Sequence, residues 1–555
     1  MATIKFSETL QTLKEWVVSN NDNTLKKLHW SVDSLIFKNG TCYGFGWVFH
    51  EEKEIQDLKL MIKFANSETL VITAELGKLK DNIAADFPKY PLAMNSGYTF
   101  LGSYSQDEKQ FIKLTLCGTF ADNLAFEINI TQYLSAKYVY VRQLTIFCKR
   151  GWYLFKTRQF ASLYEKVKRY ILGRPKSFLA EPEILCKKLT LNELESAVLV
   201  IDHDLGGGAN HYRDRLVAEK IKEGFTIIIF SYHIPTLSYL LIIKNKRLNK
   251  RFSIPNCDFL FRLAEQIKYK EIIYNTAVSF DNPDEIPQLI IKLKNWFNPQ
   301  LILLAHDFFM VCPSYFLLDD TGVFCGIPNI NQCQNCLNKN QQSLINLIKS
   351  RDINEWRSSW GNVLELADEV RTFSNNTLTL FQKAYPLSDF SHAVVKPHTV
   401  DYLKFKAVYP SYTTTLRIGV VGQIGYHKGA KFIQALAQEI KVRNLNIEII
   451  IIGSIEVQCE ISVVRQTGIY QHNQLPTLIE NSGVNIMLFS SICPETFSYV
   501  VQELIEMKLP IACFNFGAPA ERLSNYAKGL ILKEHEASLV LDELIAFHKH
   551  IYSLN

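Results

Sequence analysis

Residues 416–440 read LRIGVVGQIGYHKGAKFIQALAQEI, which places an apolar strand, a glycine loop and an amphipathic helix in direct succession. Such a unit is typical of a parallel sheet covered by helices, with the loop at the carboxyl edge of the sheet. Glycines there let the backbone approach an anionic group, and the first turn of the helix offers N–H donors. We therefore predict a doubly wound α/β domain that begins near Leu416 and binds an anion at this loop.

Strands and helices alternate on both sides of this unit. Downstream, the apolar strands are NIEIIIIGS (446–454), NIMLFSS (485–491) and PIACFNF (510–516). Upstream, AVLVIDHD, FTIIIFSYH and LILLAHDF alternate with helical patterns, of which EIPQLIIKLKNWF at 285–297 is the clearest. The sequence thus predicts two Rossmann-like domains that face a cleft, one over residues 196–410 and the other over residues 411–555.

The first part of the chain has a different character. Short alternating strands broken by Gly, Asn and Asp predict an all-β sandwich accessory domain over residues 1–150. Helical spacing and two prolines predict a helical linker over 151–195. Trp30 and Trp47 flank the first strands, and we favour core positions for both over a surface that stacks on a glycan.

Composition narrows the class of protein. The 555 residues are 47% hydrophobic and 21% charged, which excludes a disordered chain, collagen and coiled coil. A net charge of +5 is too small for a dedicated nucleic-acid binder, so we expect no nucleic acid partner. No apolar run reaches the ~20 residues that span a bilayer, and the N-terminus lacks the layout of a signal peptide. We expect a cytoplasmic protein, at most peripheral at the inner face of the membrane.

Two segments bear on that peripheral location and on anion binding. KNKRLNKR (244–251) suits a hairpin tip that touches anionic lipid headgroups or, as we favour, a solvated turn. Gly206, Gly207 and Gly208 lie between a strand and a helix, as either a ligand loop or a plain tight turn. Their spacing is not GxGxxG, which disfavours a dinucleotide cofactor of the dehydrogenase type.

The second α/β domain carries the sharper signal. Lys428 stands at the helix entrance, where it can meet a diphosphate as a point charge. In CPETFSYVVQE, Glu495 follows a strand and Glu503 lies about two turns into a helix that begins near Phe497. Two turns advance about 11 Å, so one carboxylate can face a sugar while the other reaches a ribose. Glutamates at this interval in an arbitrary sequence are more often surface residues.

These motifs, together with the GAPAE turn, resemble the donor-binding domain of GT-B glycosyltransferases, specifically glycosyltransferase family 4, from Leu416 to about Lys533. Upstream, DHDLGGGANHYRDRL and LILLAHDFF resemble the family's first glycine loop and its strand that ends in a histidine. The resemblance covers roughly residues 196 to 535 and leaves out the first 150. It implies a GT-B fold and a retaining hexosyl or deoxyhexosyl transfer (EC 2.4) from a nucleotide sugar, without a catalytic metal.

The resemblance also assigns roles to residues. Glu495 would contact the transferred sugar, Lys428 the diphosphate, and His306 would lie beside the anomeric centre. The residues assigned to the nucleotide sugar are Gly206, Gly207, Gly208, Gly422, Gln423, Gly425, Thr496, Phe497, Ser498 and Glu503, the last at the ribose. The first three of these glycines would line the acceptor side or the distal phosphate.

One residue departs from the family pattern. Gln423 stands where the family commonly has an arginine, so a cation that stabilises the leaving group is absent from that position. Arg213, Arg215 and His427 are the candidates to replace it; otherwise we expect reduced activity.

A cysteine cluster forms a separate candidate site in an insert at 312–336. Cys312, Cys325, Cys333 and Cys336 lie within 25 residues, the last two as CxxC. This pattern suits a closed, structural four-sulfur zinc site, and the alternative is free buried thiols or a labile disulfide. The spacing also resembles a cysteine-bearing insert in family 4 enzymes of bacterial O-antigen and capsule pathways.

The prediction for function is a glycosyltransferase that moves a sugar from a dTDP-, UDP- or GDP-sugar to a growing surface glycan such as O-antigen, capsule or lipopolysaccharide. A glycan or lipid-linked glycan acceptor and partner glycosyltransferases are the expected partners. The alternative from another class is a catalytically silent GT-B subunit that binds glycan or a partner transferase. A third interpretation keeps the fold but makes the protein a nucleotide-sugar epimerase or a phosphorylase.

Overall fold

The computed structural model describes residues 26–66, 68–104, 111–134, 182–187, 189–340, 342–400, 407–408 and 415–553. The chain forms two compact units, Met1–Arg174 and Pro175–Asn555. Of the predicted linker 151–195, residues 151–181 and 188 lie outside the described residues, and α6 (Pro182–Cys186) and α7 (Leu191–Glu195) are its described helices. The domain boundaries drawn from the sequence stay predictions. Within the described part, no helix is long and apolar enough to cross a bilayer.

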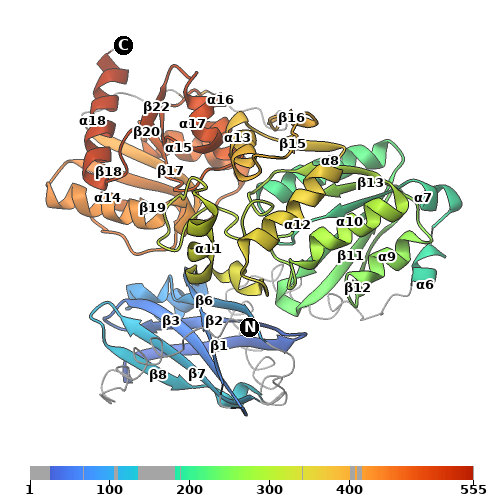
Figure 1. The fold of residues 1–555 in the computed structure, drawn as a ribbon. Coiled ribbons are helices and arrows are strands. Elements are labelled where there is room, and N and C mark those ends of the chain that lie inside the picture. Colours follow the sequence, from blue (N-terminus) through green and yellow to red (C-terminus); the bar gives the residue numbers. More distant parts are fainter. Residues whose placement is uncertain are drawn as a thin grey trace. The chain divides into compact units, whose positions relative to one another are not determined.

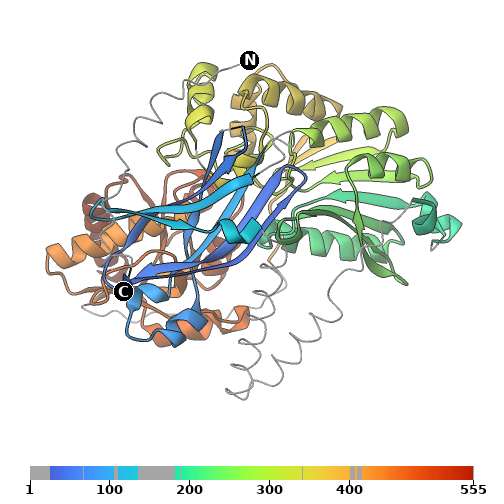
Figure 2. The ribbon, with the colours of Figure 1, turned by 90° about the horizontal axis from the view of Figure 1, so that it is seen from below.

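The first unit contains two antiparallel sheets (Figures 1 and 2). One has the order β1 (Leu28–Lys38), β2 (Thr41–His50), β6 (Gly97–Ser103), β5 (Glu75–Lys78). The other has the order β4 (Thr69–Thr73), β3 (Ile55–Phe64), β7 (Phe111–Phe120), β8 (Ala125–Asn129), and a short helix α3 spans Asp81–Asp86.

Both sheets contribute to one core, which makes the unit a β-sandwich. Val32 and Phe100 from one sheet and Leu60 and Leu116 from the other belong to the same buried cluster. Alternation explains the pattern, because Leu58, Leu60 and Ile62 share one face of β3 and are fully buried. Trp30 packs partly buried against this core and Trp47 packs against a smaller cluster that contains Phe49.

The second unit begins with a mostly parallel sheet of order β12-β11-β10-β9-β13-β14-β15-β16 (Figure 1). Its strands are β9 (Ala197–Ile201), β10 (Thr226–His233), β11 (Ser238–Lys244), β12 (Asn249–Ile254), β13 (Tyr269–Tyr274), β14 (Gln300–Leu304), β15 (Glu369–Thr372) and β16 (Ala393–Val395). The helices along this part are α8 (Gly208–Lys222), α9 (Asp258–Ala264), α10 (Glu285–Phe297), α11 (Ile330–Lys339), α12 (Ile353–Leu366) and α13 (Asn375–Ala384).

The basic segment 244–251 forms the tip of the antiparallel hairpin β11–β12, as predicted. Arg247 pairs with Glu193 at 2.5 Å and Arg251 with Asp204 at 3.0 Å. Two of its cations are therefore held by carboxylates of the same chain, which fits a solvated turn.

The rest of the second unit is a fully parallel sheet of order β19-β18-β17-β20-β21-β22. Its strands are β17 (Leu416–Ile424), β18 (Ile447–Ile455), β19 (Val464–Gln466), β20 (Ile486–Phe489), β21 (Ile511–Phe514) and β22 (Gly529–Leu532). Its helices are α14 (Ala430–Val442), α15 (Leu475–Ser482), α16 (Tyr499–Glu506), α17 (Gly517–Leu523) and α18 (Ala537–Ser553).

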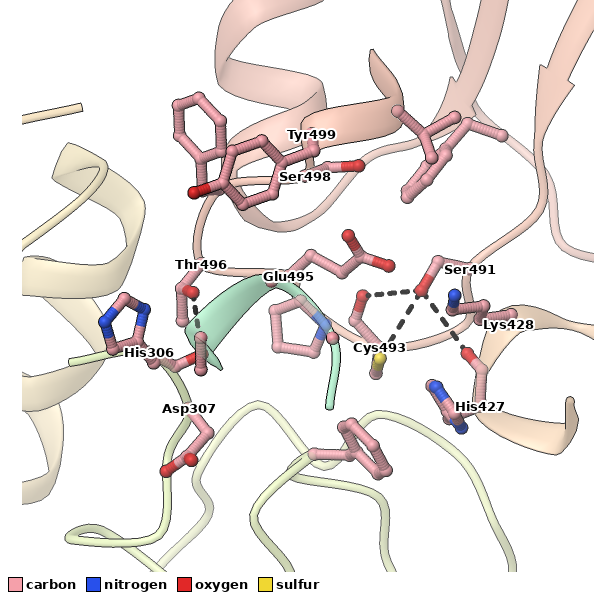
Figure 3. Close-up of a pocket in the computed structure, with 18 of the residues that line it drawn as sticks. His306, Asp307, His427, Lys428, Ser491, Cys493, Glu495, Thr496, Ser498 and Tyr499 are labelled. Atoms are coloured by element: carbon pink, nitrogen blue, oxygen red, sulfur yellow. Dashed lines mark hydrogen bonds between the residues drawn. The ribbon is translucent and has the colours of Figure 1, made fainter. Parts of the chain in front are cut away.

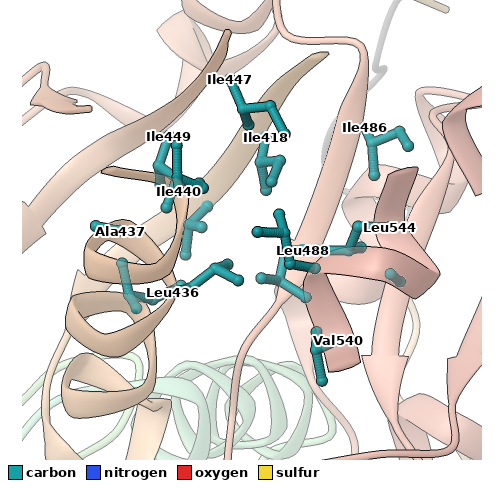
Figure 4. Close-up of a cluster of buried hydrophobic side chains, with 14 of the residues drawn as sticks. Ile418, Leu436, Ala437, Ile440, Ile447, Ile449, Ile486, Leu488, Val540 and Leu544 are labelled. Atoms are coloured by element: carbon teal, nitrogen blue, oxygen red, sulfur yellow. The ribbon is translucent and has the colours of Figure 1, made fainter. Parts of the chain in front are cut away.

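Helices cover both faces of this sheet, which explains its continuous apolar strands. Ile449 and Ile451 of β18 face α14 and α18 in one core cluster (Figure 4). Ile450 and Ile452 face the opposite cluster, which holds residues of α15 and α16. Two Rossmann-like parallel sheets thus lie in one compact unit, preceded by a β-sandwich, and this is the predicted GT-B fold.

Candidate active site

A cavity of about 530 Å³ lies in the second unit and is lined by both Rossmann-like domains. Its lining on the β9–β16 side includes His203, Gly206, Gly207, Gly208, His306, Asp307, Phe316 and His398. On the β17–β22 side it includes His427, Lys428, Ser490, Ser491, Cys493, Glu495, Thr496, Phe497, Ser498 and Tyr499. Its walls come from the carboxyl edges of both sheets, where ligands of open α/β sheets bind.

The first glycine loop is fixed by a buried aspartate. Asp202 follows β9 and accepts hydrogen bonds from Asn210 Nδ2 (2.7 Å), Asn275 Nδ2 (2.8 Å) and Arg213 Nη1 (2.7 Å). Gly206 and Gly207 have φ of +85° and +86°, and a Cβ on either would meet no atom within 4 Å. No side chain covers the backbone of these two glycines, so a ligand in the cavity can approach it closely.

His306 stands just beyond β14 as a neutral imidazole. Its ring stacks on Phe373 at 4.5 Å, and Tyr212 lies edge-on at 5.0 Å. Burial, assisted by the charges of His203 and Arg371, lowers the pKa of His306 to about 3. Its Nε2 atom is buried and has no hydrogen-bond partner among the described residues, so it is a candidate contact for a bound hydroxyl.

Asp307, which the sequence analysis did not single out, lines the cavity beside His306 (Figure 3). Its carboxylate accepts hydrogen bonds from Thr276 Oγ1 at 2.6 Å and from the Phe309 amide at 2.9 Å. Burial raises the pKa of Asp307 above its ordinary value, and these hydrogen bonds oppose that rise. Its position directly after a strand end could have marked Asp307 as a candidate site residue, but the family resemblance assigned a role only to the neighbouring histidine.

Lys428 is positioned by a glycine that no larger residue can replace without movement. Gly429 has a φ of +84°, and a Cβ there would lie 2.1 Å from the Ser490 carbonyl oxygen. The Ser490 hydroxyl donates to the Lys428 carbonyl at 2.7 Å, and the Ile492 amide donates to the His427 carbonyl at 3.0 Å. These contacts lock the loop after β17 onto the segment after β20.

Glu495 is held between β20 and α16 by the GAPAE turn. The Ala518 amide donates to the Glu495 carbonyl at 2.8 Å. Gly517 has a φ of +72°, and a Cβ there would lie 2.8 Å from the Glu495 nitrogen. Burial raises the pKa of Glu495, whereas Lys428 and the Ser498 and Ser491 hydroxyls lower it. Figure 3 shows Glu495 between Lys428 and Ser491 on one side and His306 on the other.

The N-terminus of α16 faces the same cavity. The helix begins at Tyr499, two residues later than predicted, and the Ser498 hydroxyl caps it by accepting from the Val501 amide at 3.4 Å. The amides of Thr496, Phe497 and Ser498 make no hydrogen bond to any described residue. Unpaired amides at the positive end of a helix form a ready anion site.

Four of the residues assigned to the nucleotide sugar do not line this cavity: Gly422, Gln423, Gly425 and Glu503. Glu503 is buried in α16 and its Oε1 lies 2.8 Å from Nε2 of His472, which is 45% exposed. Gln423 is exposed. The contact of Glu503 with a ribose stays a prediction, in which the ribose hydroxyls share this carboxylate with His472 or replace it.

Of the three cations named as substitutes at the leaving group, only His427 lines the cavity, where it stacks on Phe316 at 4.2 Å. Arg213 is held by Asp202 and Asp214. Arg215 donates to the Thr399 carbonyl at 2.6 Å and to the Tyr499 hydroxyl at 2.8 Å.

His398 is a cavity residue that sequence reasoning missed. It stacks on Phe497 at 4.4 Å, and its Nδ1 lies 2.6 Å from the Tyr499 hydroxyl. Burial, with the charges of His306, Arg215 and Arg522, lowers the pKa of His398 to about 2. A lone histidine in the segment KPHTV carries no motif, so only the fold reveals it.

The four cysteines of the insert line a second, separate cavity of about 280 Å³. All four are free thiols. Within the described residues, no three His, Cys, Asp or Glu side chains form a group that could already hold a metal ion.

Comparison with known proteins places part of this chain in a family. Residues 401–549 match the family described as glycosyl transferases group 1, so the chain carries a domain of that group. No curated protein matches the sequence significantly.

Solved structures are similar only at low identity. Anabaena HepE, in complex with UDP and glucose, has a TM-score of 0.39 and 15% identity over 63% of this chain and 89% of its own. A glycosyltransferase from Rickettsia africae has a TM-score of 0.42 and 14% identity over 64% and 89%. A mutant of S. aureus TarM, in complex with Fondaparinux, alpha-GlcNAc-glycerol and UDP, has a TM-score of 0.36 and 10% identity over 98% and 79%.

Proposed function

We propose that this protein transfers a sugar from a nucleotide-sugar donor to a glycan acceptor. One observation carries the proposal: Lys428, Glu495 and the N-terminus of α16 converge on a single cavity, which His306 and the first glycine loop face from the other domain. The match of residues 401–549 to glycosyl transferases group 1 supports it.

Each group in this cavity suits one part of such a donor. The ammonium of Lys428 and the amides at Thr496, Phe497 and Ser498 offer a cation and N–H donors to a diphosphate. The carboxylate of Glu495 accepts hydrogen bonds, as a ring of sugar hydroxyls requires. Because the walls are largely buried, these interactions are stronger there than in water.

The reaction we propose is a front-face substitution at the anomeric carbon. The bond from that carbon to the diphosphate oxygen breaks with its electron pair on the phosphate, and a bond to the acceptor oxygen forms on the same face. The proton of the acceptor hydroxyl passes to the departing phosphate, so no protein nucleophile is needed. Lys428 and the α16 amides stabilise the charge that develops.

His306 and Asp307 lie on the opposite wall. Since the pKa of His306 is lowered to about 3 by burial, its imidazole is neutral at physiological pH and acts as a hydrogen-bonding group, not as a cation. Asp307 and the bare backbone of Gly206 and Gly207 are the groups we assign to the acceptor side of the cavity.

The finer identity of the substrates extends this proposal. We propose a dTDP-, UDP- or GDP-sugar as donor and a surface polysaccharide of the O-antigen or capsule kind as acceptor. The resemblance to family 4 supports that choice and the retention of anomeric configuration.

Binding and turnover test the proposal together. Calorimetry and thermal shift with UDP, dTDP and GDP should show stabilisation by one nucleotide, by about 2.7 kcal/mol at a hundredfold excess over its Kd. Hydrolysis or transfer of the matching sugar nucleotide is then followed by chromatography. A folded protein that binds none of these nucleotides would refute the transferase proposal.

A second candidate is a catalytically silent subunit that binds glycan or a partner transferase. The exposed side chain of Gln423 favours it, because no arginine stands at the expected leaving-group position and Arg213 and Arg215 are engaged elsewhere. Selective nucleotide binding without any turnover of the sugar nucleotides, with and without a glycan acceptor, would support this candidate.

A further inference from the structure

The insert between β14 and α12 gathers four cysteines that the proposed chemistry does not use. Cys312, Cys325, Cys333 and Cys336 all line one cavity of about 280 Å³, which is distinct from the candidate active site. None is in a disulfide. A free cysteine usually packs singly, as a small apolar side chain. Four thiols that line one cavity therefore suggest a role besides packing.

A metal ion that enters this cavity would displace the thiol protons and bind the four sulfurs as thiolates.

Two positive side chains, Arg357 and Lys339, lie at this cavity, where four thiolates would add negative charge. A divalent ion held by four thiolates carries two negative charges. Nη2 of Arg357 lies 3.5 Å from Cys333 Sγ, and its Nε donates to the Val311 carbonyl at 3.2 Å, which fixes the guanidinium. Lys339 lines the same cavity, and so do Asp319 and Asp320, so the two cations offset only part of the negative charge there.

We propose that Cys312, Cys325, Cys333 and Cys336 bind a metal centre through four thiolates. Two centres share this ligand chemistry, a tetrahedral zinc ion and an iron–sulfur cluster. Because no described ligand group stands at single-ion spacing, zinc requires the thiols to close inward, and a χ1 change moves a sulfur by about 3 Å. A cluster fills a wider space with less movement.

This centre would stabilise a bridge to the second Rossmann-like domain. Within the insert, Phe316 stacks on His427 at 4.2 Å and Phe324 lies 5.5 Å from Phe516. The metal would fix the loop that carries both aromatic rings, beside Lys428 but without contact to substrate.

The experiment measures metal on the full-length protein, purified without oxygen from cells supplied with zinc and iron. We expect about one zinc per chain, or about four irons with equal acid-labile sulfide and an absorbance near ~400 nm. Cys325→Ser and Cys333→Ser should lose more than about nine-tenths of that metal, whereas Cys459→Ser, a free cysteine outside the insert, should keep it.

A second measurement keeps the proposal falsifiable if the serine variants misfold. Metal-free wild-type protein that remains folded is titrated with Co²⁺, and thiolate ligation should give intense charge-transfer and tetrahedral d–d bands. At the same time four thiols should become protected from a thiol reagent. Folded wild-type protein that binds neither cobalt nor zinc and lacks iron, or that shows a disulfide between any two of these cysteines, would overturn the proposal.

Discussion

Replacement of Glu495 best separates an effect on sugar transfer from an effect on the stability of the fold. In Glu495→Gln the shape remains but the charge that accepts sugar hydroxyls is lost. We expect transfer to fall by roughly 100-fold or more, the size of effect seen for a lost electrostatic contact at a reacting centre. Turnover of the sugar nucleotide under saturating donor measures this.

Thermal stability of the same variant should change in the opposite direction. Burial raises the pKa of Glu495 above its ordinary value of 4.5, so folding favours the protonated acid. The stability that this group contributes is fully present below pH 4.5 and is lost as pH rises through the raised pKa. The Tm of Glu495→Gln relative to the parent should therefore increase between pH ~4.5 and ~8. A constant difference across this range would show that burial of the carboxylate has no cost.

Lys428 makes a separate prediction at the residue scale. Removing a charge-assisted contact to a phosphate costs about 1.5–3 kcal/mol, so Lys428→Ala should weaken nucleotide binding about 10- to 100-fold. Lys431, three residues on, is the matched control, because it is exposed and lies over the Tyr426 ring at 5.6 Å instead of lining the cavity. Calorimetry should find near-parental affinity in Lys431→Ala. Equal losses in both variants would indicate a general surface charge effect.

The sequence predicted a site residue where that residue belongs to a local sequence motif. Lys428 and Glu495 follow strand ends in recognisable motifs, and the structure brings both to the same cavity. His398 and His472 could not be found, because each acts through a partner far away in sequence, Tyr499 and Glu503 respectively. Such pairings depend on tertiary packing that a local pattern does not contain.

At the scale of elements, the loop between β17 and α14 depends on Gly429. In Gly429→Ala the left-handed φ of +84° costs about 1–3 kcal/mol, and the Cβ also meets the Ser490 carbonyl oxygen at 2.1 Å. Gly468 has a similar φ of +80° with no atom within 4 Å of a Cβ, so Gly468→Ala carries the conformational strain alone. Chemical denaturation should show the larger loss of unfolding free energy in Gly429→Ala, and its nucleotide affinity should fall because Lys428 moves. Equal losses of unfolding free energy in the two variants would mean that the Ser490 backbone moves aside to accommodate the methyl group.

Strongly periodic elements were predictable and interrupted ones were not. The helix predicted at 285–297 matches α10 residue for residue. Strand β6 was missed because its glycines look like breaks; Gly102 instead lies in close contact, since its Cβ would meet Ile72 at 3.0 Å. Helix α12 was also missed, although Ile353, Trp356, Trp360 and Val363 are buried at helical spacing, because Gly361 interrupts the pattern.

For the molecule's second unit as a whole, the contacts that join its two Rossmann-like domains give the last prediction. Arg215 of α8 donates to the Tyr499 hydroxyl at 2.8 Å, and that hydroxyl lies 2.6 Å from His398 Nδ1. Because burial lowers the pKa of His398 to about 2, its ring is neutral at neutral pH, and Nδ1 and the tyrosine hydroxyl share a hydrogen bond whose direction is set by the histidine tautomer. The hydroxyl therefore links the helix after the first glycine loop to the helix that carries the proposed phosphate site.

Tyr499→Phe removes this link and keeps the ring that packs edge-on against Phe497 at 5.2 Å. Two lost hydrogen bonds weaken the contact between the domains by about 1–3 kcal/mol. We expect little change in nucleotide affinity, faster amide exchange in α8 and α16, and a higher ratio of donor hydrolysis to transfer, because a looser cleft admits water. Tyr526→Phe loses a single hydrogen bond, to the Leu509 carbonyl within one domain, and should change neither the exchange nor that ratio. Unchanged exchange in Tyr499→Phe would show that other contacts hold the domains together.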